Sequence, residues 1–350
     1  ALALAGNGTT ITVSNGVYDC IEQNILNAIV VRSVNGRLVT TLRNPPASTA
    51  RVLVLGHAQA VIEGFTLTGG LANNASGGAV NMTAGTIRYC SLRSNTASVS
   101  GVGGAAYMTG GTMHDCIVTN NYGATGGGGL YLAGACLVSN CVIVANQAEH
   151  GGAGASVASA GAVVTHCELY DNTNTYYNGG GGIIMSAGTV QNCLIAGNRT
   201  TYTGAGAGGG GVRQSGGALI HCTIVSNRVP VEQTCGGMYR SGGTVTNSVI
   251  WDNWRGAARE DLTNTAGIGY SCALELTNGV NGNISADPAF KGSAAHNYRL
   301  TAGSPCVDRG IFISWMTGAT DLDGKKRVIG AQPDMGAYET SPRGALFLVH

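Results

Sequence analysis

The stretch GIIMSAGTVQNCLIAGN, residues 182–198, contains the unit from which most of this chain is built. Six cysteines recur at spacings of 26, 25, 26, 26 and 29 residues, and each is followed five residues later by an asparagine. The cysteines are Cys90, Cys116, Cys141, Cys167, Cys193 and Cys222, and the asparagines are Asn95, Asn121, Asn146, Asn172, Asn198 and Asn227. A further copy has Ser248 and Asn253 in the same two places. A fixed period of roughly 20 to 50 residues is typical of repeat proteins, so the sequence predicts a solenoid.

The repeat carries a strand pattern on both sides of its cysteine. An apolar residue stands two positions after each cysteine and another stands three positions before it, as Ile195 and Val190 do around Cys193. The apolar runs are short, rich in β-branched residues and separated by glycines, which is typical of strands and too short for helices. We therefore expect an all-β parallel β-helix with two or three short strands in each coil and coils stacked about 4.8 Å apart.

Stacking would align the cysteines and the asparagines in two columns. A column of unpaired thiols fills a narrow apolar interior without leaving strongly polar groups unsatisfied. An asparagine tolerates the left-handed backbone region of a tight turn, and its amide can bond to the same amide one coil away. The alternative for the cysteines is a metal column, but zinc and iron sites use short paired spacings such as C-x-x-C, which the sequence lacks. We expect neither a metal nor a cofactor.

Composition narrows the class of protein. With 57 glycines, 11% charged residues and 44% apolar residues in 350, the chain has too many apolar groups for simple disorder, and we interpret the glycines as turns. No apolar run approaches 18 residues, so no transmembrane segment is expected. The net charge is +1 and the basic residues are scattered, which argues against nucleic acid as a partner.

The period divides the chain into three expected regions. Residues 1–77 repeat weakly and are expected to hold the amino-terminal cap and the first coils, residues 78–256 the regular coils, and residues 257–350 a terminal module of different composition. Cys272 and Cys306 fall in this last region, where the sequence is compatible with a disulfide and with two free thiols.

Two sets of motifs resemble known families. Glycine pairs that precede a short apolar run, such as Gly77-Gly78-Ala79-Val80, occur together with runs such as Ile143-Val144-Ala145-Asn146. Both motifs resemble the repeats of the pectate-lyase-like right-handed β-helix superfamily and of polymorphic outer-membrane adhesins. The carboxyl-terminal motifs are similar to the end module of bacterial extracellular β-helix proteins, the choice-of-anchor domains. These motifs are Asp287-Pro288-Ala289-Phe290, Tyr298-Arg299-Leu300, Ser304-Pro305-Cys306-Val307-Asp308-Arg309-Gly310, Asp321-Leu322-Asp323-Gly324 and Asp334-Met335-Gly336-Ala337-Tyr338-Glu339. The resemblance implies an exported bacterial protein, extracellular or on the cell surface. Its implied fold is a right-handed single-stranded parallel β-helix (solenoid) with an irregular carboxyl-terminal cap, and no one activity is implied.

An enzyme of this fold would need a base. Many β-helix polysaccharide lyases use a lysine or arginine beside carboxylates that hold calcium. Lysine is absent before Lys291, which leaves an arginine base. Arg213 and Arg240 fall in or beside the first strand of successive coils, as does Tyr239, so these three are the catalytic candidates.

Acids and histidines give little support for catalysis. The few acids of the regular coils are Asp115, Glu149, Glu168, Asp171, Glu232 and Asp252, and their spacing predicts no pair within the roughly 5 to 9.5 Å that glycoside hydrolysis requires. His166 and His221 precede ladder cysteines and are interpreted as an exposed, outward polar row, while His150 lies in a loop beside Glu149. Asp321-x-Asp323-Gly324 resembles the start of a calcium loop, but the lysines that follow favour an ordinary turn.

Tyrosines give the better ligand site. Several recur at the outward position of the first strand or in the loops after the asparagine column, where flat rings beside polar groups suit a sugar chain. The alternative is that they only pack on neighbouring strands or cover glycine-rich loops. The ligand-binding candidates are Tyr107, Tyr131, Tyr176, Tyr177, Tyr202, Arg213 and Tyr239.

These features favour a surface protein that binds polysaccharide or a cell-surface glycan, as an adhesin or structural subunit. The alternative is a polysaccharide lyase or glycoside hydrolase that acts in a groove along the β-helix. A third hypothesis is a filament subunit whose partners are other copies of the chain, because exposed strand edges can pair between molecules. Paired acids or a calcium site in a groove would favour the enzyme.

Overall fold

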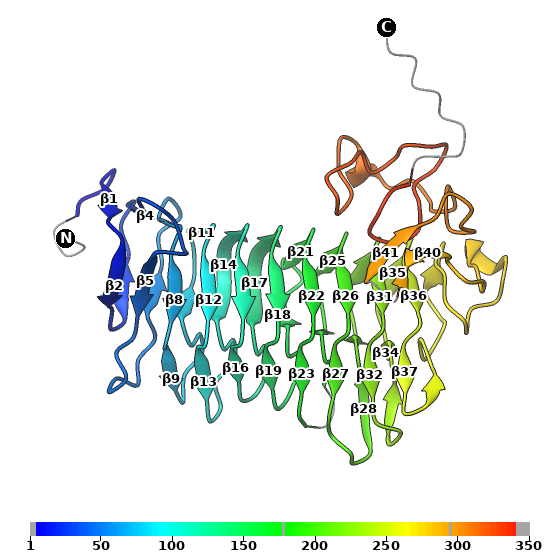
Figure 1. Ribbon diagram of the computed structural model, residues 1–350, viewed down its shortest axis with the longest axis horizontal. Coiled ribbons are helices and arrows are strands. Elements are labelled where there is room, and N and C mark those ends of the chain that lie inside the picture. Colours follow the sequence, from blue (N-terminus) through cyan, green and yellow to red (C-terminus); the bar gives the residue numbers. More distant parts are fainter. Residues whose placement is uncertain (1–4, 177–178, 294–295, 341–350) are drawn as a thin grey trace, which may run out of the picture.

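The chain forms a right-handed parallel β-helix in which about ten coils stack along the long axis (Figure 1), so the expected fold class is confirmed. The computed structural model describes residues 5–176, 179–293 and 296–340. Three parallel sheets, here called A, B and C, form the sides of the coils. None of the described residues belongs to a helix with the length and hydropathy of a membrane span.

Sheets B and C each receive one short strand from a coil. The strands of sheet B are β2 (Gly16–Asp19), β5 (Thr40–Arg43), β8 (Thr66–Thr68), β12 (Ser91–Arg93), β15 (Ile117–Thr119), β18 (Val142–Val144), β22 (Glu168–Tyr170), β26 (Leu194–Ala196), β31 (Thr223–Val225) and β36 (Val249–Trp251). Those of sheet C are β9 (Leu71–Asn73), β13 (Thr96–Ser98), β16 (Tyr122–Gly123), β19 (Gln147–Ala148), β23 (Thr173–Asn174), β27 (Arg199–Thr200), β32 (Arg228–Val229), β37 (Trp254–Arg255) and the antiparallel β38 (Ala258–Arg259).

Sheet A receives two strand segments from each regular coil, which makes four segments in a coil where the sequence predicted two or three. The first column contains β3 (Gln23–Ile25), β6 (Leu53–Leu55), β10 (Val80–Met82), β20 (Ala155–Val157), β24 (Ile183–Met185), β29 (Val212–Gln214) and β34 (Met238–Arg240). The second contains β1 (Thr10–Val13), β4 (Val30–Ser33), β7 (Val61–Glu63), β11 (Thr86–Arg88), β21 (Val163–Thr165), β25 (Thr189–Gln191), β30 (Ala218–Ile220), β35 (Thr244–Thr246) and β39 (Ile268–Gly269). Two longer strands, β14 (Ala106–His114) and β17 (Leu130–Ser139), run through both columns.

The cysteine column lies inside the coils as predicted. All six ladder thiols are buried. Each thiol donates a weak hydrogen bond to the carbonyl oxygen two residues before it, at 3.1–3.4 Å. The side chains two positions after the cysteines, such as Ile195 and Ile224, are fully buried beside them. The thiols therefore act as small apolar core groups that also satisfy a strand-end carbonyl.

The asparagine column forms the amide ladder that the sequence predicts. From Asn95 to Asn253, each side-chain nitrogen donates to the side-chain oxygen one coil further on, at 2.9–3.0 Å, and Asp261 accepts the last of these bonds. The ladder asparagines themselves do not have a positive φ. The left-handed residue is the one before each of them, for example Asp171 with φ 54° and Asp252 with φ 57°. Asparagine suits the ladder position because its side-chain amide both donates and accepts a hydrogen bond. Its tolerance of the left-handed backbone region plays no part there.

A second left-handed position precedes every ladder cysteine. Its φ lies between 49° and 55° in each coil. The residues there are Tyr89, Asp115, Asn140, His166, Asn192, His221 and Asn247. Asparagine, aspartate and histidine are the non-glycine residues that adopt this conformation most readily, which explains their recurrence at the corner between sheets A and B.

The remaining elements are short. They are β28 (Gly206–Gly209), which pairs with β33 (Gln233–Cys235), the antiparallel pair β40 (Phe290–Gly292) and β41 (Asn297–Leu300), and the 3-10 turns η2 (Val280–Gly282) and η4 (Ser314–Met316). The segment that follows β39 covers the last coil. In this segment the backbone of Cys272 forms isolated parallel β-bridges with Val249 and with Ile284.

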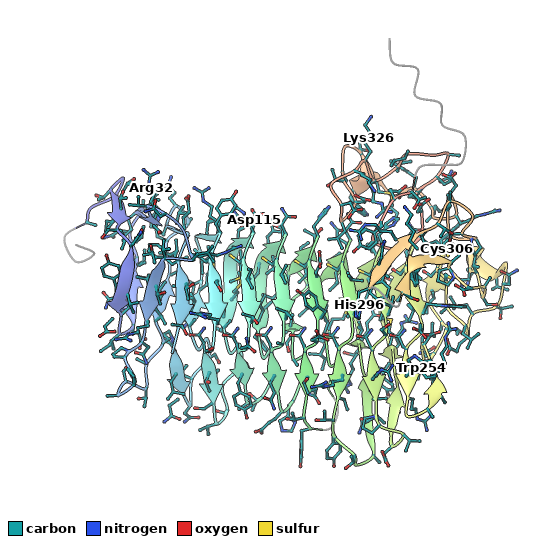
Figure 2. The ribbon with its side chains drawn as sticks, in the orientation of Figure 1. Arg32, Asp115, Trp254, His296, Cys306 and Lys326 are labelled. Atoms are coloured by element: carbon teal, nitrogen blue, oxygen red, sulfur yellow. The ribbon has the colours of Figure 1, made fainter. Side chains whose placement is uncertain are left out.

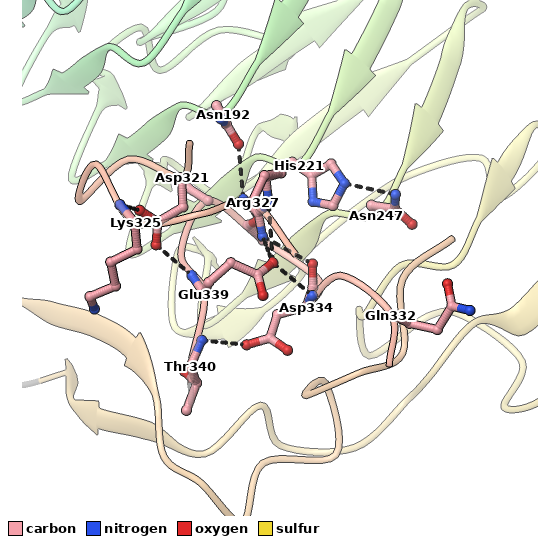
Figure 3. A network of polar contacts seen from close by, with 12 residues as sticks. Asn192, His221, Asn247, Asp321, Lys325, Arg327, Gln332, Asp334, Glu339 and Thr340 are labelled. Atoms are coloured by element: carbon pink, nitrogen blue, oxygen red, sulfur yellow. Dashed lines mark hydrogen bonds and ion pairs between the residues drawn. The ribbon is translucent and has the colours of Figure 1, made fainter. Parts of the chain in front are cut away.

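The end module, here residues 286–340, packs along the flank of the last coils, as Figure 1 shows in orange and red. Tyr298 and Tyr338 pack against Leu194 and Val225 on the outer side of sheet B. At the corner between sheets A and B, Arg327 is fully buried and donates to Asn192 Oδ1 at 2.9 Å and to the Glu339 carboxylate (Figure 3). The module is therefore held by an apolar contact on one side and a buried polar network on the other.

This packing overturns the expectation of an exposed histidine row. His221 has no exposed surface; Asn247 donates to its Nε2 at 2.8 Å and the Trp315 ring lies 5.8 Å away. His166 Nε2 lies 2.9 Å from the carbonyl oxygen of Thr320. The sequence could not predict that the end module covers these histidines, because the module is an irregular segment that lies about a hundred residues or more further along the chain.

The motif at Asp321 forms a turn, as expected. Its Oδ1 accepts the backbone N–H groups of Asp323 and Lys325, and its Oδ2 accepts that of Glu339. Cys272 and Cys306 are free thiols that contact each other in a buried cluster between the last coil and the end module.

Candidate functional site

The outer face of the first strand column of sheet A presents one side chain from each coil in a continuous row. The strand registers place these side chains directly opposite one another on neighbouring strands. The row contains Asn81, Tyr107, Tyr131, Ser156, Ile184, Arg213 and Tyr239. Alternation along each strand explains it, because the residues on either side of each member point into the core.

Two of these tyrosines form a flat platform. The rings of Tyr107 and Tyr131 lie 5.8 Å apart with an angle of 26° between their planes. Both residues are half-buried, so part of each side chain remains accessible on the outer face. Such a surface can cover the apolar C–H face of a sugar ring and still bond to its hydroxyls.

A cleft of about 430 Å³ opens beside this platform. Its floor is formed by Tyr131, Ser156, Ile184 and Arg213, four successive members of the row. One wall comes from the loops that join sheet C to sheet A, and the other comes from the turns that follow the floor strands. The wall residues are Thr125, His150, Gly151, Ala158, Ser186 and Ser215, and Val157 of β20 completes the lining.

Arg213 is the cation of this cleft. Its Nε is buried and has no hydrogen-bond partner among the described residues. Because this nitrogen is buried, a bound molecule would meet the accessible part of the half-buried Arg213 side chain, which lines the cleft. Ser215 and Ser186 add hydroxyl groups along the same wall.

Aromatic side chains extend the wall along the loops. His150 and Tyr176 make an edge contact with ring centroids 4.8 Å apart, and Tyr176 lies 5.1 Å from Tyr202. Tyr122 donates to the carboxylate of Glu149; burial and this carboxylate raise the pKa of Tyr122 to about 12. Tyr177, the remaining candidate of this group, lies outside the described residues.

Arg240 is placed away from the cleft. Its side chain points inward and is 3% exposed. The guanidinium donates to Gln214 Oε1 at 3.0 Å and to the carbonyl oxygens of Asn264 and Ala266. Arg240 therefore holds the turns of the last coils together, while its neighbour Tyr239 stays on the outer row beside Arg213.

The chemistry open to the cleft follows from its lining. Among the described residues that line it, there is no carboxylate and no lysine, and no cluster of three or more metal-binding side chains occurs in the described parts of the chain. Two-carboxylate glycoside hydrolysis therefore has no support here. The arrangement offers ring stacking, hydroxyl hydrogen bonds and one guanidinium for an anionic group.

A second cleft, of about 310 Å³, lies between sheet B and the end module. Glu168, Asp171 and Tyr170 line it from the coils, and His296 and Tyr298 line it from the module (Figure 2 labels His296). It brings acids near a histidine that the sequence alone could not pair with them. Tyr298 donates to Ser226 and His296 lies 3.1 Å from the Tyr298 hydroxyl, so part of its polar lining is already satisfied within the protein.

The sequence missed part of the first cleft. Ser156, Ser186 and Ser215 were not singled out, although Ser156 occupies the same outward position as Tyr131 and is found by alignment on the cysteines. His150 was noted only for its neighbour Glu149, and the structure places it on the wall facing Arg213. Loop residues of this kind carry no periodic signal.

No protein-family model matches the sequence, and no curated protein matches it. Among solved structures, pectate lyase Pel9A superposes with a TM-score of 0.58 at 12% identity, covering 97% of this chain and 89% of that one. The A-module of the mannuronan C-5 epimerase AlgE6 of Azotobacter vinelandii gives 0.44 at 14% identity, covering 82% and 93%. The pectin methylesterase of Aspergillus niger gives 0.35 at 13% identity, covering 75% and 84%. The coil architecture and the superposition on Pel9A together identify the fold as that of the pectate-lyase-like right-handed parallel β-helices.

Proposed function

We propose that the protein binds an extended polysaccharide along the outer face of sheet A, with an acidic sugar unit in the cleft at Arg213. The place of Arg213 in the cleft, on one line with the tyrosine platform and with no carboxylate among the described lining residues, is the observation that carries this proposal. A carboxylate or sulfate group of the ligand would accept hydrogen bonds from the Arg213 guanidinium, and charged hydrogen bonds of this kind are among the stronger ones in proteins.

The row gives the ligand its direction. Members of the row repeat about every 4.8 Å along the axis, and the platform of Tyr107 and Tyr131 lies on the same line as Arg213. A linear chain laid along this line would stack one sugar on the tyrosines while another reaches the arginine. The superposition on a pectate lyase concerns the fold, and a polysaccharide ligand agrees with it.

The same residue supports a second candidate function, a polysaccharide lyase with Arg213 as its base. Within the described lining, Arg213, His150 and the Tyr131 hydroxyl are the groups that could accept or relay a proton. The proposed setting in both cases is outside the cell or on its surface, as the motifs of the end module suggest. The alternatives of an adhesin and of a filament subunit remain compatible with a binding row on one sheet.

Incubation with polygalacturonate, alginate and neutral dextran tests the proposal. Retention of the protein on immobilised polygalacturonate or alginate, without new unsaturated or reducing ends, is the expected result. Release of unsaturated ends that the Arg213→Gln variant abolishes would establish the lyase instead. Equal retention on dextran, or none on any polymer, would contradict acidic polysaccharide as the ligand.

A further inference from the structure

Two arginines face each other on the outer side of sheet C. Arg199 in β27 pairs in register with Arg228 in β32, and both side chains are exposed. Neither guanidinium has a hydrogen bond or ion pair with another described residue. The next position in this row is Trp254, labelled in Figure 2, and the guanidinium of Arg228 lies 6.0 Å from the centroid of its ring.

Like charges in this arrangement are unusual for this chain. In the described strands, the other charged residues that face each other have opposite signs: Asp19 with Arg43, and Glu63 with both Arg32 and Arg88. The ion pairs Asp19–Arg43 and Glu63–Arg88 are formed, each at 2.6 Å. The arginine pair of sheet C is therefore the exception to a rule that the rest of the solenoid follows.

The pair carries unfavourable electrostatics that an anion would remove. Neighbouring strands lie about 4.8 Å apart, and like charges directly opposite each other destabilise a sheet. A single carboxylate or sulfate between the two guanidinium groups would change repulsion into two charge-assisted hydrogen bonds. Trp254 holds one of the two cations over its ring and offers an apolar edge to the rest of a ligand.

The remainder of the row suits a sugar chain better than a nucleic acid. Towards the amino terminus it continues through Thr173, Gln147 and Tyr122, which are neutral hydrogen-bonding side chains. A nucleic acid backbone would need unpaired cations repeated along the row. Among its described members only Arg199 and Arg228 are unpaired, because Arg259, which faces Trp254, forms an ion pair with Asp261. Neutral polar groups beside a single cationic pair fit a polymer with hydroxyls and a spaced anionic group.

We propose that Arg199, Arg228 and Trp254 form a second ligand site on sheet C, which binds the sulfate ester or carboxylate of an acidic polysaccharide. The site lies on a different sheet from Arg213 and does not depend on the function proposed for sheet A. A chain with two such faces can engage two polymer strands, or two stretches of one.

Dextran sulfate and uncharged dextran are the probes, titrated into the full chain in 50 mM NaCl. Arg199→Gln and Arg228→Gln should each weaken dextran sulfate binding about tenfold, since each removes a charged hydrogen-bond donor. The matched control is Arg93→Gln, an exposed arginine of β12 that faces threonines on both neighbouring strands, and it should change the affinity less than about twofold. Wild-type affinity in both sheet C variants would overturn the proposal, as would equal binding of dextran or tighter binding of single-stranded DNA.

The Arg199→Glu variant shows whether Arg199 serves ligand binding or the stability of the fold, because the two roles predict different changes in Tm and in affinity. The new carboxylate would face Arg228 and form the cross-strand pair found elsewhere in the chain, so Tm should rise by about 1–3 °C at low salt, and the gain should disappear at 1 M NaCl. Binding of dextran sulfate should still fall at least tenfold. In an Arg213→Gln background, the loss caused by Arg228→Gln must persist, which distinguishes failure of this site from failure of the cleft on sheet A. Retained binding in Arg199→Glu would overturn the proposal.

Discussion

Arg327 and Glu339 form an ion pair that is enclosed between the end module and the β-helix, with 0% and 2% of their surfaces exposed. The carboxylate also accepts the backbone N–H of Asp334 at 2.9 Å, and the guanidinium reaches Asn192 on the coils. Two motifs of the end module and one corner of the solenoid therefore meet in one network (Figure 3). The module is docked through a carboxyl group that cannot lose its partner without leaving a buried polar group unpaired.

Replacement of Arg327 by methionine should lower the free energy of unfolding by about 3–5 kcal/mol, because Glu339 would remain buried and unpaired. Urea denaturation followed by circular dichroism measures this cost. The control is Arg43→Met, which breaks the exposed pair with Asp19 and should cost less than about 1 kcal/mol. Equal costs for the two variants would show that the buried network does not hold the module.

Acid should weaken the docking of the end module through His221. Burial, together with the nearby Arg327 cation, holds the pKa of His221 well below its usual value. The unfolded chain therefore takes up the proton first, and this contribution to stability is present above about pH 6.5 and is lost as the pH falls below it, by up to about 1.4 kcal/mol per pH unit.

His221→Asn is the matched variant for this effect, because the left-handed corner position holds asparagine in other coils. The variant should fold and should lose less stability than the wild type between pH 7 and 5. Urea midpoints at several pH values give the comparison. The same pH dependence in both proteins would mean that other groups cause it.

The amide ladder should be a large local source of stability. Asn146 accepts two hydrogen bonds from Asn121, to Oδ1 from the backbone and side-chain nitrogens, and its own amide donates to Asn172. Asn146→Ala should cost about 2–4 kcal/mol, since buried donors and acceptors lose their partners on both sides. The exposed Gln147 is the control, and Gln147→Ala should change stability by less than about 0.5 kcal/mol in the same urea experiment.

Arg213 and Arg240 should differ in what their loss affects. Arg240→Gln removes a buried bond to Gln214 and bonds to turn carbonyls, so it should lower stability by about 2–4 kcal/mol and leave polygalacturonate affinity within about twofold. Arg213→Gln should leave stability within about 1 kcal/mol and weaken polygalacturonate binding. Titration calorimetry and urea denaturation on both variants measure the two effects. Loss of affinity in a folded Arg240 variant would contradict the assignment.

The repetitive part of the fold could be predicted from the sequence because its core is periodic. Each ladder position, such as that of Cys193 or Asn198, is filled by the same residue type at one spacing, and only stacked coils satisfy such a pattern. The outward row on sheet A follows from the same alignment. So does the arginine pair of sheet C, since Arg199 and Arg228 each come directly after a ladder asparagine.

The rest depends on contacts without a period. Burial of His221 comes from residues of the end module that are distant in sequence, and no local pattern distinguishes it from the exposed histidine that we expected. Arg240 follows an outward tyrosine, so strict alternation along the strand predicts an inward side chain. We did not predict this, because arginine is rarely buried unless its charge is paired. Its partners are turn carbonyls, which only the folded chain brings together.

Calorimetric titration of polygalacturonate into the wild-type protein and into a Tyr131→Ala, Arg213→Gln double variant tests the central claim, that sheet A binds an acidic polysaccharide at this cleft. Wild-type protein should bind polygalacturonate and not dextran, and the double variant should bind at least about tenfold more weakly while keeping the circular dichroism spectrum of the folded wild type. Unchanged affinity in the folded double variant would contradict the claim.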